Sequence, residues 1–196
     1  MKTLLITGFD PFGGESINPS WEAVQRLPEE IGAYRLYKMQ IPTRFGEAAE
    51  KVLETAREIL PDAIISVGQA GGRKGITPEM VAINLREASI ADNAGHQPTD
   101  APVVSGGPAA YFATLPVRKM VDSMKAAGLP ASLSFSAGAF VCNDVMYTLL
   151  HHFQGTNVQC GFIHVPFLPQ QAKENGPSLS LDEMVKGLAA AVAALE

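Results

Sequence analysis

The stretch from Lys2 to Trp21, KTLLITGFDPFGGESINPSW, decides the fold class because it joins a strand, a glycine-rich turn and a helix start. Residues 2–8 form an apolar run that predicts a buried strand, and Asn18 before Pro19 predicts an N-cap and a first helical residue. Glycine-rich turns after a first strand commonly bind phosphate. Two phenylalanines in this turn are untypical of a phosphate loop. The rest of the chain is therefore needed to identify what this loop binds.

Outward from this stretch, apolar runs alternate with amphipathic segments. Further strands are predicted over 33–42, 62–68, 131–136 and 157–167, and helices over 18–27, 45–60, 117–127, 142–153 and 181–195, the last capped by Ser180. Residues 69–116 are less regular, which is typical of a functional segment or of short irregular strands. The alternation predicts a three-layer α/β/α sandwich, with a mostly parallel twisted sheet and helices on both faces.

Length and composition limit the class of protein. We expect a single domain over 1–196, because 196 residues with 46% apolar and 18% charged side chains suit one globular core. The net charge of −5, without a cluster of Lys and Arg, argues against a nucleic-acid partner. No signal peptide or membrane-spanning stretch is recognisable, so we expect a cytoplasmic protein without a membrane partner. The two cysteines are widely spaced, which indicates neither a metal site nor a disulfide framework.

A parallel sheet brings the carboxyl ends of its strands to one edge, where ligands bind. The segments expected at this edge are 9–14, 69–72, 137–142 and 164–167. Cys142 is predicted at the start of a helix, a position that can lower the pKa of a thiol and offers free backbone N–H groups as an oxyanion hole. A small buried apolar side chain is the alternative interpretation of Cys142, and we interpret Cys160, inside a strand, as part of the core.

His164 ends the strand that follows the Cys142 helix, so the two side chains can meet at the same edge. The alternative is a histidine satisfied within the core. Glu79, shortly after the glycine-rich turn at 68–72, is a third group that could orient an imidazole, although spacing alone does not distinguish it from a solvated glutamate. His96, His151 and His152 are assigned no site.

Five motifs in one order carry a resemblance over nearly the whole chain. They are GFDPFGGESINPSW at 8–21, GQAGGRKGITPEMVAIN at 68–84, DNAGHQPTD at 92–100, SFSAGAFVCNDVMY at 134–147 and HVPFLP at 164–169. In these motifs the chain resembles the pyroglutamyl peptidase I (pyrrolidone-carboxylate peptidase) family of cysteine peptidases. The resemblance implies an omega-peptidase that hydrolyses the amide after an N-terminal pyroglutamyl residue through a thioester. It also implies a cytosolic homo-oligomer, a tetramer or dimer, without a metal or organic cofactor.

Carried over by motif, the resemblance implies a catalytic triad of Cys142, His164 and Glu79. It also implies a binding site for the pyroglutamyl ring, which is made of Phe9, Phe12, Asn18, Gln69, Phe140 and Val141. Ile90 would be a further apolar wall of this site. From the residues themselves, Phe9 and Phe12 could equally fill the core under the turn, and Asn18 could simply cap the helix at Pro19.

The chain departs from the family pattern at Met80 and Ser89, where the family commonly carries a basic residue. A noncatalytic or weakly active relative is therefore one alternative. A nucleotide-binding or phosphate-binding protein that uses the two glycine-rich turns as anion loops is another, although the first turn lacks the Lys-Ser/Thr ending of a P-loop and the spacing of a dinucleotide fold.

Overall fold

The structure, a computed structural model, describes residues 1–173 and 176–195. The strand predicted at the start of the chain, β1 (Lys2–Phe9), lies inside a six-stranded sheet. A separate two-stranded ribbon is formed by β6 (Val81–Ile83) and β7 (Ala110–Phe112). The remaining strands of the large sheet are β2 (Glu30–Ile31), β3 (Tyr34–Ile41), β4 (Ala63–Gln69), β5 (Thr77–Pro78) and β8 (Gln159–Val165).

The strand order of the large sheet is β2-β3-β1-β4-β8-β5. The four inner strands β3, β1, β4 and β8 run parallel, whereas the short edge strands β2 and β5 run antiparallel to their neighbours. The carboxyl ends of β1, β4 and β8 therefore lie side by side. This confirms the predicted mostly parallel sheet and places Phe9, Gln69 and Val165 at one edge.

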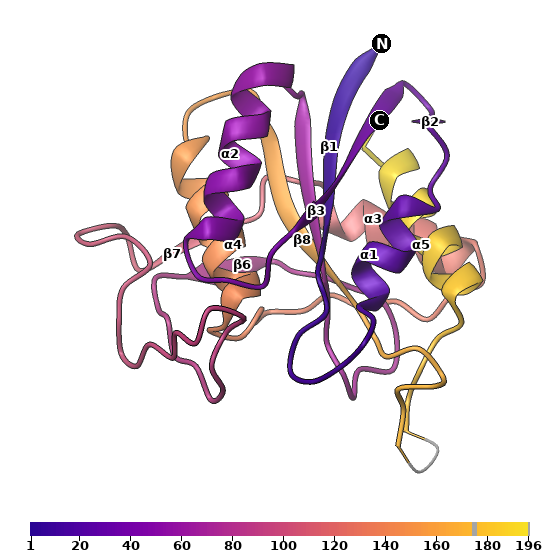
Figure 1. The fold of residues 1–196 in the computed structure, drawn as a ribbon. Coiled ribbons are helices and arrows are strands. Elements are labelled where there is room, and N and C mark those ends of the chain that lie inside the picture. Colours follow the sequence, from indigo (N-terminus) through magenta and orange to yellow (C-terminus); the bar gives the residue numbers. More distant parts are fainter. Residues whose placement is uncertain (174–175, 196) are drawn as a thin grey trace.

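Helices cover both faces of the sheet, as Figure 1 shows, which confirms the three-layer α/β/α architecture. One face packs against α1 (Pro19–Gln25), α3 (Val117–Ala126) and α5 (Leu181–Ala193). The other packs against α2 (Glu47–Ile59) and α4 (Val141–His152). Each layer of helices has its own apolar core, and the side chains of the central strands alternate between the two.

Two helix starts follow the predicted local chemistry. The Asn18 side chain accepts a hydrogen bond from the backbone N–H of Ser20, with Pro19 as the first residue of α1. Ser180 and Glu183 form a reciprocal capping box at the start of α5. The α1 cap fixes the end of the loop that follows β1 and so helps to position that loop at the carboxyl edge.

The strand predicted over 131–136 is not formed, which corrects the sequence interpretation. Only isolated bridges link this segment to residues 76 and 79, and the strand next to β8 is instead β5. Ser134 donates to the carbonyl of Pro78 at 3.0 Å, but proline has no N–H to donate in return, so a regular ladder cannot continue there. The irregular segment 69–116 contains β5, β6 and β7, as expected.

Candidate active site

His164 and Glu79 form a buried pair at the carboxyl edge. His164 is the last residue but one of β8. Its Nδ1 atom lies 2.7 Å from Oε1 of Glu79, and both side chains are almost completely buried. Glu79 follows β5, and its backbone N–H donates to the carbonyl of Phe162 on β8 at 2.9 Å. Since a carboxylate can only accept, the proton of the neutral ring lies on Nδ1 and Nε2 is left as the basic nitrogen.

The surroundings of this pair favour a neutral imidazole beside an ionised carboxylate. Burial lowers the pKa of His164 below its ordinary value and outweighs the hydrogen bond and charge of Glu79, which act in the opposite direction. Burial alone would raise the pKa of Glu79, but the hydrogen bond and charge of His164 hold it below its usual range. A neutral imidazole can accept a proton at Nε2, as a general base must.

Arg73 is a member of this cluster that sequence reasoning did not identify. Its Nη1 lies 2.6 Å from the same Oε1 of Glu79, and it also donates to the hydroxyl of Thr77. Nη2 donates to the carbonyl of Ser136 at 3.1 Å, in the loop that leads to α4. The available signal was the pair of cations, Arg73 and Lys74, between the glycine-rich turn and Glu79 in the stretch GQAGGRKGITPE.

Cys142 is the second residue of α4, directly above the sheet. The N-cap residue Phe140 makes no side-chain capping bond, so the first N–H groups of α4 have no capping side chain. Gly138 has a φ of 77°, which allows the sharp turn before the helix. On β4, a Cβ added to Gly68 would lie 2.9 Å from the Sγ atom of Cys142. The thiol therefore rests against Gly68, which pairs with His164 in the sheet register.

The surroundings of Cys142 raise the pKa of its thiol, whereas a helix start by itself can lower it. Burial raises the pKa of Cys142 to about 12, the charge of Glu79 raises it further, and Arg73 opposes both. Among the described residues, no hydrogen bond links this thiol to the His164 ring, and such contacts often tighten only with substrate bound. Cys160 is 1% exposed, as expected of a core residue, and burial raises its pKa to about 12.

Aromatic rings lie on the α2/α4 side of the thiol. The ring centroids of Phe12 and Phe140 are 6.1 Å apart, and Phe45, which sequence reasoning missed, meets Phe140 edge-on at 5.2 Å. Phe9 is only 2% exposed, and its ring centroid lies 6.2 Å from that of Phe162. The centroid of the Phe162 ring lies in turn 4.7 Å from that of the His164 ring. Phe12 and Phe140 thus provide an accessible apolar wall, and Phe9 lies in the layer beneath it.

The other predicted ring contacts have partners within the protein. Asn18 caps α1 through Oδ1, and its Nδ2 donates to the carbonyl of Asp10 at 2.9 Å. Gln69 accepts a hydrogen bond from Gln171 at 3.1 Å. Val141 is completely buried, so the structure does not show it facing the site. Ile90 is 46% exposed and lies next to Gly13 in the loop after β1.

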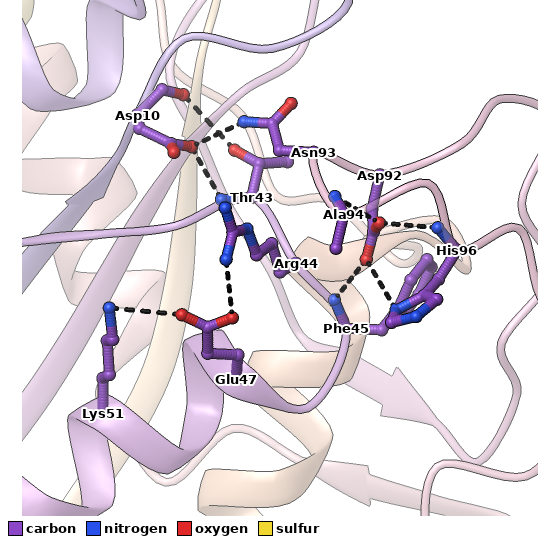
Figure 2. Close-up of polar contacts among 10 residues, drawn as sticks. All are labelled: Asp10, Thr43, Arg44, Phe45, Glu47, Lys51, Asp92, Asn93, Ala94 and His96. Carbon is purple, nitrogen blue, oxygen red and sulfur yellow. Dashed lines mark hydrogen bonds and ion pairs between the residues drawn. The ribbon is translucent and has the colours of Figure 1, made fainter.

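A polar network holds these loops together (Figure 2). Asp10 accepts from the backbone N–H of Thr43 at 2.7 Å and from the side chain of Asn93 at 3.2 Å. Asp92 accepts from the backbone N–H groups of Phe45 and His96, both at 2.9 Å. Burial opposes the charge of Asp92, but these backbone bonds hold its pKa below the usual range. The network joins three loops and fixes Phe45 against the aromatic wall.

The two departures from the family pattern lie outside the His164–Glu79 pair. Met80 packs against the core on the α3 side, and Ser89 is exposed. Arg86 directs its charge to Asp144 of α4, with 2.6 Å between Nε and Oδ1, and lies 5.9 Å from the centre of the Phe45 ring. Neither Met80 nor Ser89 forms a hydrogen bond or ion pair with the side chains of His164, Glu79 or Cys142 in the described part of the chain.

Residues 1–173 and 176–195 contain neither a metal-binding cluster nor a membrane-spanning helix. No cluster of three or more histidine, cysteine, aspartate or glutamate side chains there is arranged to hold a metal ion. Nor does any helix in those ranges combine the length and apolar character needed to cross a membrane.

A thiol at a helix start, beside a buried histidine and carboxylate on the ligand-binding edge of an α/β/α sandwich, defines the class of a cysteine-type hydrolase. Comparison with known proteins gives the family. The family model described as pyroglutamyl peptidase matches residues 1–196. The chain belongs to the pyroglutamyl peptidase family, and this match decides against the alternative of a phosphate-binding protein.

Named relatives agree over nearly the whole chain. The pyrrolidone-carboxylate peptidase of Bacillus cereus (strain Q1) is 51% identical, over 98% of this chain and 92% of the relative. That of Clostridium perfringens is 50% identical over the same shares. The crystal structure of Bacillus amyloliquefaciens pyroglutamyl peptidase I superposes with a TM-score of 0.96 at 46% identity, over 100% of this chain and 97% of the other. Pyrrolidone carboxyl peptidase from Thermococcus litoralis gives a TM-score of 0.95 at 37% identity, over 100% and 93%.

Proposed function

We propose that this protein hydrolyses the amide bond after an N-terminal pyroglutamyl residue, with Cys142 as nucleophile, His164 as base and acid, and Glu79 as the group that orients His164. The observation that carries the proposal is the 2.7 Å contact between His164 and Glu79, which leaves Nε2 free at the edge where α4 presents Cys142. Family membership supplies the substrate class.

The proposed reaction needs only groups of the chain and water. As Sγ of Cys142 attacks the pyroglutamyl carbonyl, its proton passes to Nε2 of His164, and free N–H groups at the start of α4 stabilise the oxyanion. The imidazolium then gives this proton to the leaving amine as the C–N bond breaks, which leaves a thioester. Water attacks the thioester, His164 takes a proton from the water and returns it to Sγ, and pyroglutamate is released.

The raised pKa of Cys142 supports this order of proton transfer. A raised pKa favours the thiol over a preformed thiolate, so we propose that the proton moves to His164 while the new bond forms. The lowered pKa of His164 keeps the imidazole ready to accept this proton. Arg73 holds Glu79 in place from the opposite side and is proposed as a positioning residue rather than a catalytic one.

The aromatic wall suits a flat, uncharged ring. A pyroglutamyl terminus has no ammonium group, so apolar contacts with Phe12 and Phe140 can replace the carboxylate that other aminopeptidases need. Its lactam requires one acceptor and one donor, and we assign these to Gln69 and to the remaining amide N–H of Asn18. Unpaired polar groups in such a site would cost about 1–3 kcal/mol each, which disfavours rings that lack the lactam carbonyl.

The test compares fluorogenic amides of pyroglutamate and proline. We expect release from the pyroglutamyl amide to exceed release from the prolyl amide by about 10⁴-fold in kcat/KM, because proline lacks the carbonyl that the site binds. Equal rates would contradict the proposed ring recognition. No release from either amide by folded protein would instead favour the noncatalytic relative.

We also propose a cytoplasmic homo-oligomer, a dimer or tetramer. Two free cysteines support a reducing compartment, because the proposed nucleophile must stay reduced. Large apolar side chains exposed on the described surface, among them Phe112 at 72% and Phe135 at 67%, support self-association. Sedimentation equilibrium measures the state, and a monomer at all concentrations would contradict the proposal.

A further inference from the structure

The carboxylate of Glu79 has one oxygen that the contacts described above do not use. Oε1 lies 2.7 Å from Nδ1 of His164 and 2.6 Å from Nη1 of Arg73. Oε2 is buried and has no hydrogen-bond partner among residues 1–173 and 176–195. An ionised carboxylate accepts through both oxygens, and a buried acceptor without a donor is costly. The side chains of His164 and Arg73 therefore hold this carboxylate at one oxygen only.

Ser134, the first residue of the motif at 134–147, lies opposite Glu79 on the neighbouring segment. The two residues form an isolated parallel bridge. In it the N–H of Ser134 donates to the carbonyl of Pro78 at 3.0 Å, and the N–H of Met80 donates to the carbonyl of Ser134 at 2.8 Å. Paired residues direct their side chains to the same face, and neighbouring strands lie about 4.8 Å apart. The pairing therefore places the Ser134 hydroxyl beside the Glu79 carboxylate.

In the structure, the Ser134 hydroxyl donates to a carbonyl that already has another donor. Its Oγ lies 3.2 Å from the carbonyl oxygen of Ser136, longer than the usual O–H···O distance of about 2.7–2.8 Å. The same carbonyl accepts from Nη2 of Arg73 at 3.1 Å. Oγ also accepts from the backbone N–H of Ser136 at 3.4 Å, and this contact does not use the hydroxyl proton. The proton can therefore turn away from Ser136 without leaving that carbonyl unpaired.

The electrostatic surroundings of Glu79 favour a neutral donor at Oε2. The groups near it that can carry charge are Arg73, His164 and the thiol of Cys142. Burial raises the pKa of Glu79, whereas the hydrogen bond and charge of His164 lower it, and a hydrogen bond from Ser134 acts in the same direction. The charge of Arg73 also lowers the pKa of His164, which opposes formation of the imidazolium. A hydroxyl stabilises the carboxylate without adding a second positive charge.

We propose that Ser134 is a further positioning residue of the site, whose hydroxyl turns from Ser136 to donate to Oε2 of Glu79. The inference rests on the proposed peptidase function and adds a residue to its machinery. With donors on both oxygens, the plane of the carboxylate is fixed, and so is its contact with Nδ1 of His164. The segment 131–136, which forms no regular strand, thus serves the site through a single bridge.

The test measures the pKa of His164 by NMR titration of its imidazole, assigned with His164→Gln, and kcat/KM for a pyroglutamyl amide against pH. Ser134→Ala removes the donor, so the Glu79 carboxylate becomes more basic and stabilises the imidazolium more strongly. We expect the His164 titration and the acid limb of kcat/KM to move together to higher pH. Ser134→Thr keeps a hydroxyl and should keep both at their wild-type positions. Ser132→Ala, which removes an exposed hydroxyl from the same segment, is the matched control and should move neither.

The outcomes separate this inference from the proposed function. An unmoved His164 titration in folded Ser134→Ala would overturn the inference, even if the rate fell. An equal shift in Ser134→Thr would overturn it too, because the hydroxyl would not be the cause. No amine release by folded wild type would overturn the proposed function, while the titration would still decide whether Ser134 acts on Glu79. If Ser134→Ala fails to fold by circular dichroism, Ser134→Val replaces it, since it matches Ser134→Thr in shape but lacks the hydroxyl.

Discussion

Nδ1 of His164 lies 2.7 Å from Oε1 of Glu79, although the two residues are 85 positions apart in the chain. The contact depends on the antiparallel pairing of β5 with β8, which brings the residue after Pro78 beside the end of β8. It fixes the proton on Nδ1 and leaves Nε2 as the base. The proposed mechanism therefore depends on a short edge strand as much as on the helix that carries Cys142.

Replacing Arg73 should change the pH dependence of catalysis. Arg73 lowers the pKa of both His164 and Glu79, so Arg73→Met should move the acid limb of kcat/KM to higher pH. Arg73→Lys keeps the charge and should leave the limb close to its wild-type position. The measurement is kcat/KM for a pyroglutamyl amide against pH. A lower rate in Arg73→Met with an unmoved limb would show a structural role only.

Gly68 should tolerate no side chain. A Cβ there would lie 2.7 Å from the Phe162 ring and 2.9 Å from Sγ of Cys142, so Gly68→Ala should cost about 1–3 kcal/mol in unfolding free energy and lower kcat. Ser66→Ala, two residues earlier on the same face, serves as the control. The Ser66 hydroxyl is buried and has no hydrogen-bond partner among the residues that the structure describes, so its removal should not destabilise the protein. Urea unfolding measures both, and a Gly68→Ala variant with wild-type stability and kcat would argue against the described packing.

Removing the Phe12 ring should weaken substrate binding and leave the thiol intact. Phe12→Ala should raise KM by about tenfold, since it removes one apolar wall of the ring site. The rate of iodoacetamide alkylation of Cys142 should not fall. Tyr37→Ala, which truncates a 48% exposed ring elsewhere, is the control and should change neither quantity. An unchanged KM in Phe12→Ala would remove this residue from the ring site.

Acid should destabilise the protein through two groups, His164 and Glu79, whose pKa values are both lowered by folding. His164 has a folded pKa below its ordinary 6.5, so the unfolded chain binds more protons and stability falls as pH drops below that value. Glu79 also has a lowered folded pKa, so its contribution is present above its ordinary 4.5 and is lost as pH falls through the folded value. Urea unfolding between about pH 8 and pH 3 should show this decline. His164→Gln should lessen the loss that begins near 6.5, and an unchanged profile in this variant would contradict the assigned pKa direction.

Local sequence patterns predicted most of the fold. The buried run of β1, the Asn18–Pro19 cap of α1 and the Ser180 cap of α5 depend on nearest neighbours, so they could be read from the chain. The segment 131–136 alternates like a strand but runs beside Pro78, which lacks the N–H that a ladder requires. Alternation alone does not show whether a partner strand can complete the pairing.

The candidate site was predictable only in part. The topology of a parallel sheet predicted Cys142 and His164 at the same edge. Arg73 and Phe45 join the candidate site through tertiary contacts, which the hydrophobic periodicity of the sequence does not reveal. A helix start can lower the pKa of a thiol, but it does not reveal the burial against Gly68 and the charge of Glu79, which raise the pKa of Cys142. Burial of a side chain depends on the packed elements around it, not on its own helix.

The most direct test of the central claim is the rate of amine release from a fluorogenic pyroglutamyl amide by wild type, Cys142→Ala and Cys160→Ala. Cys142 is the proposed nucleophile and Cys160 is a core residue, so the pair separates thiol chemistry from the loss of any cysteine. We expect Cys142→Ala to lose at least about 10³-fold in kcat, while folded Cys160→Ala stays close to wild type. Wild-type activity in Cys142→Ala would contradict the account.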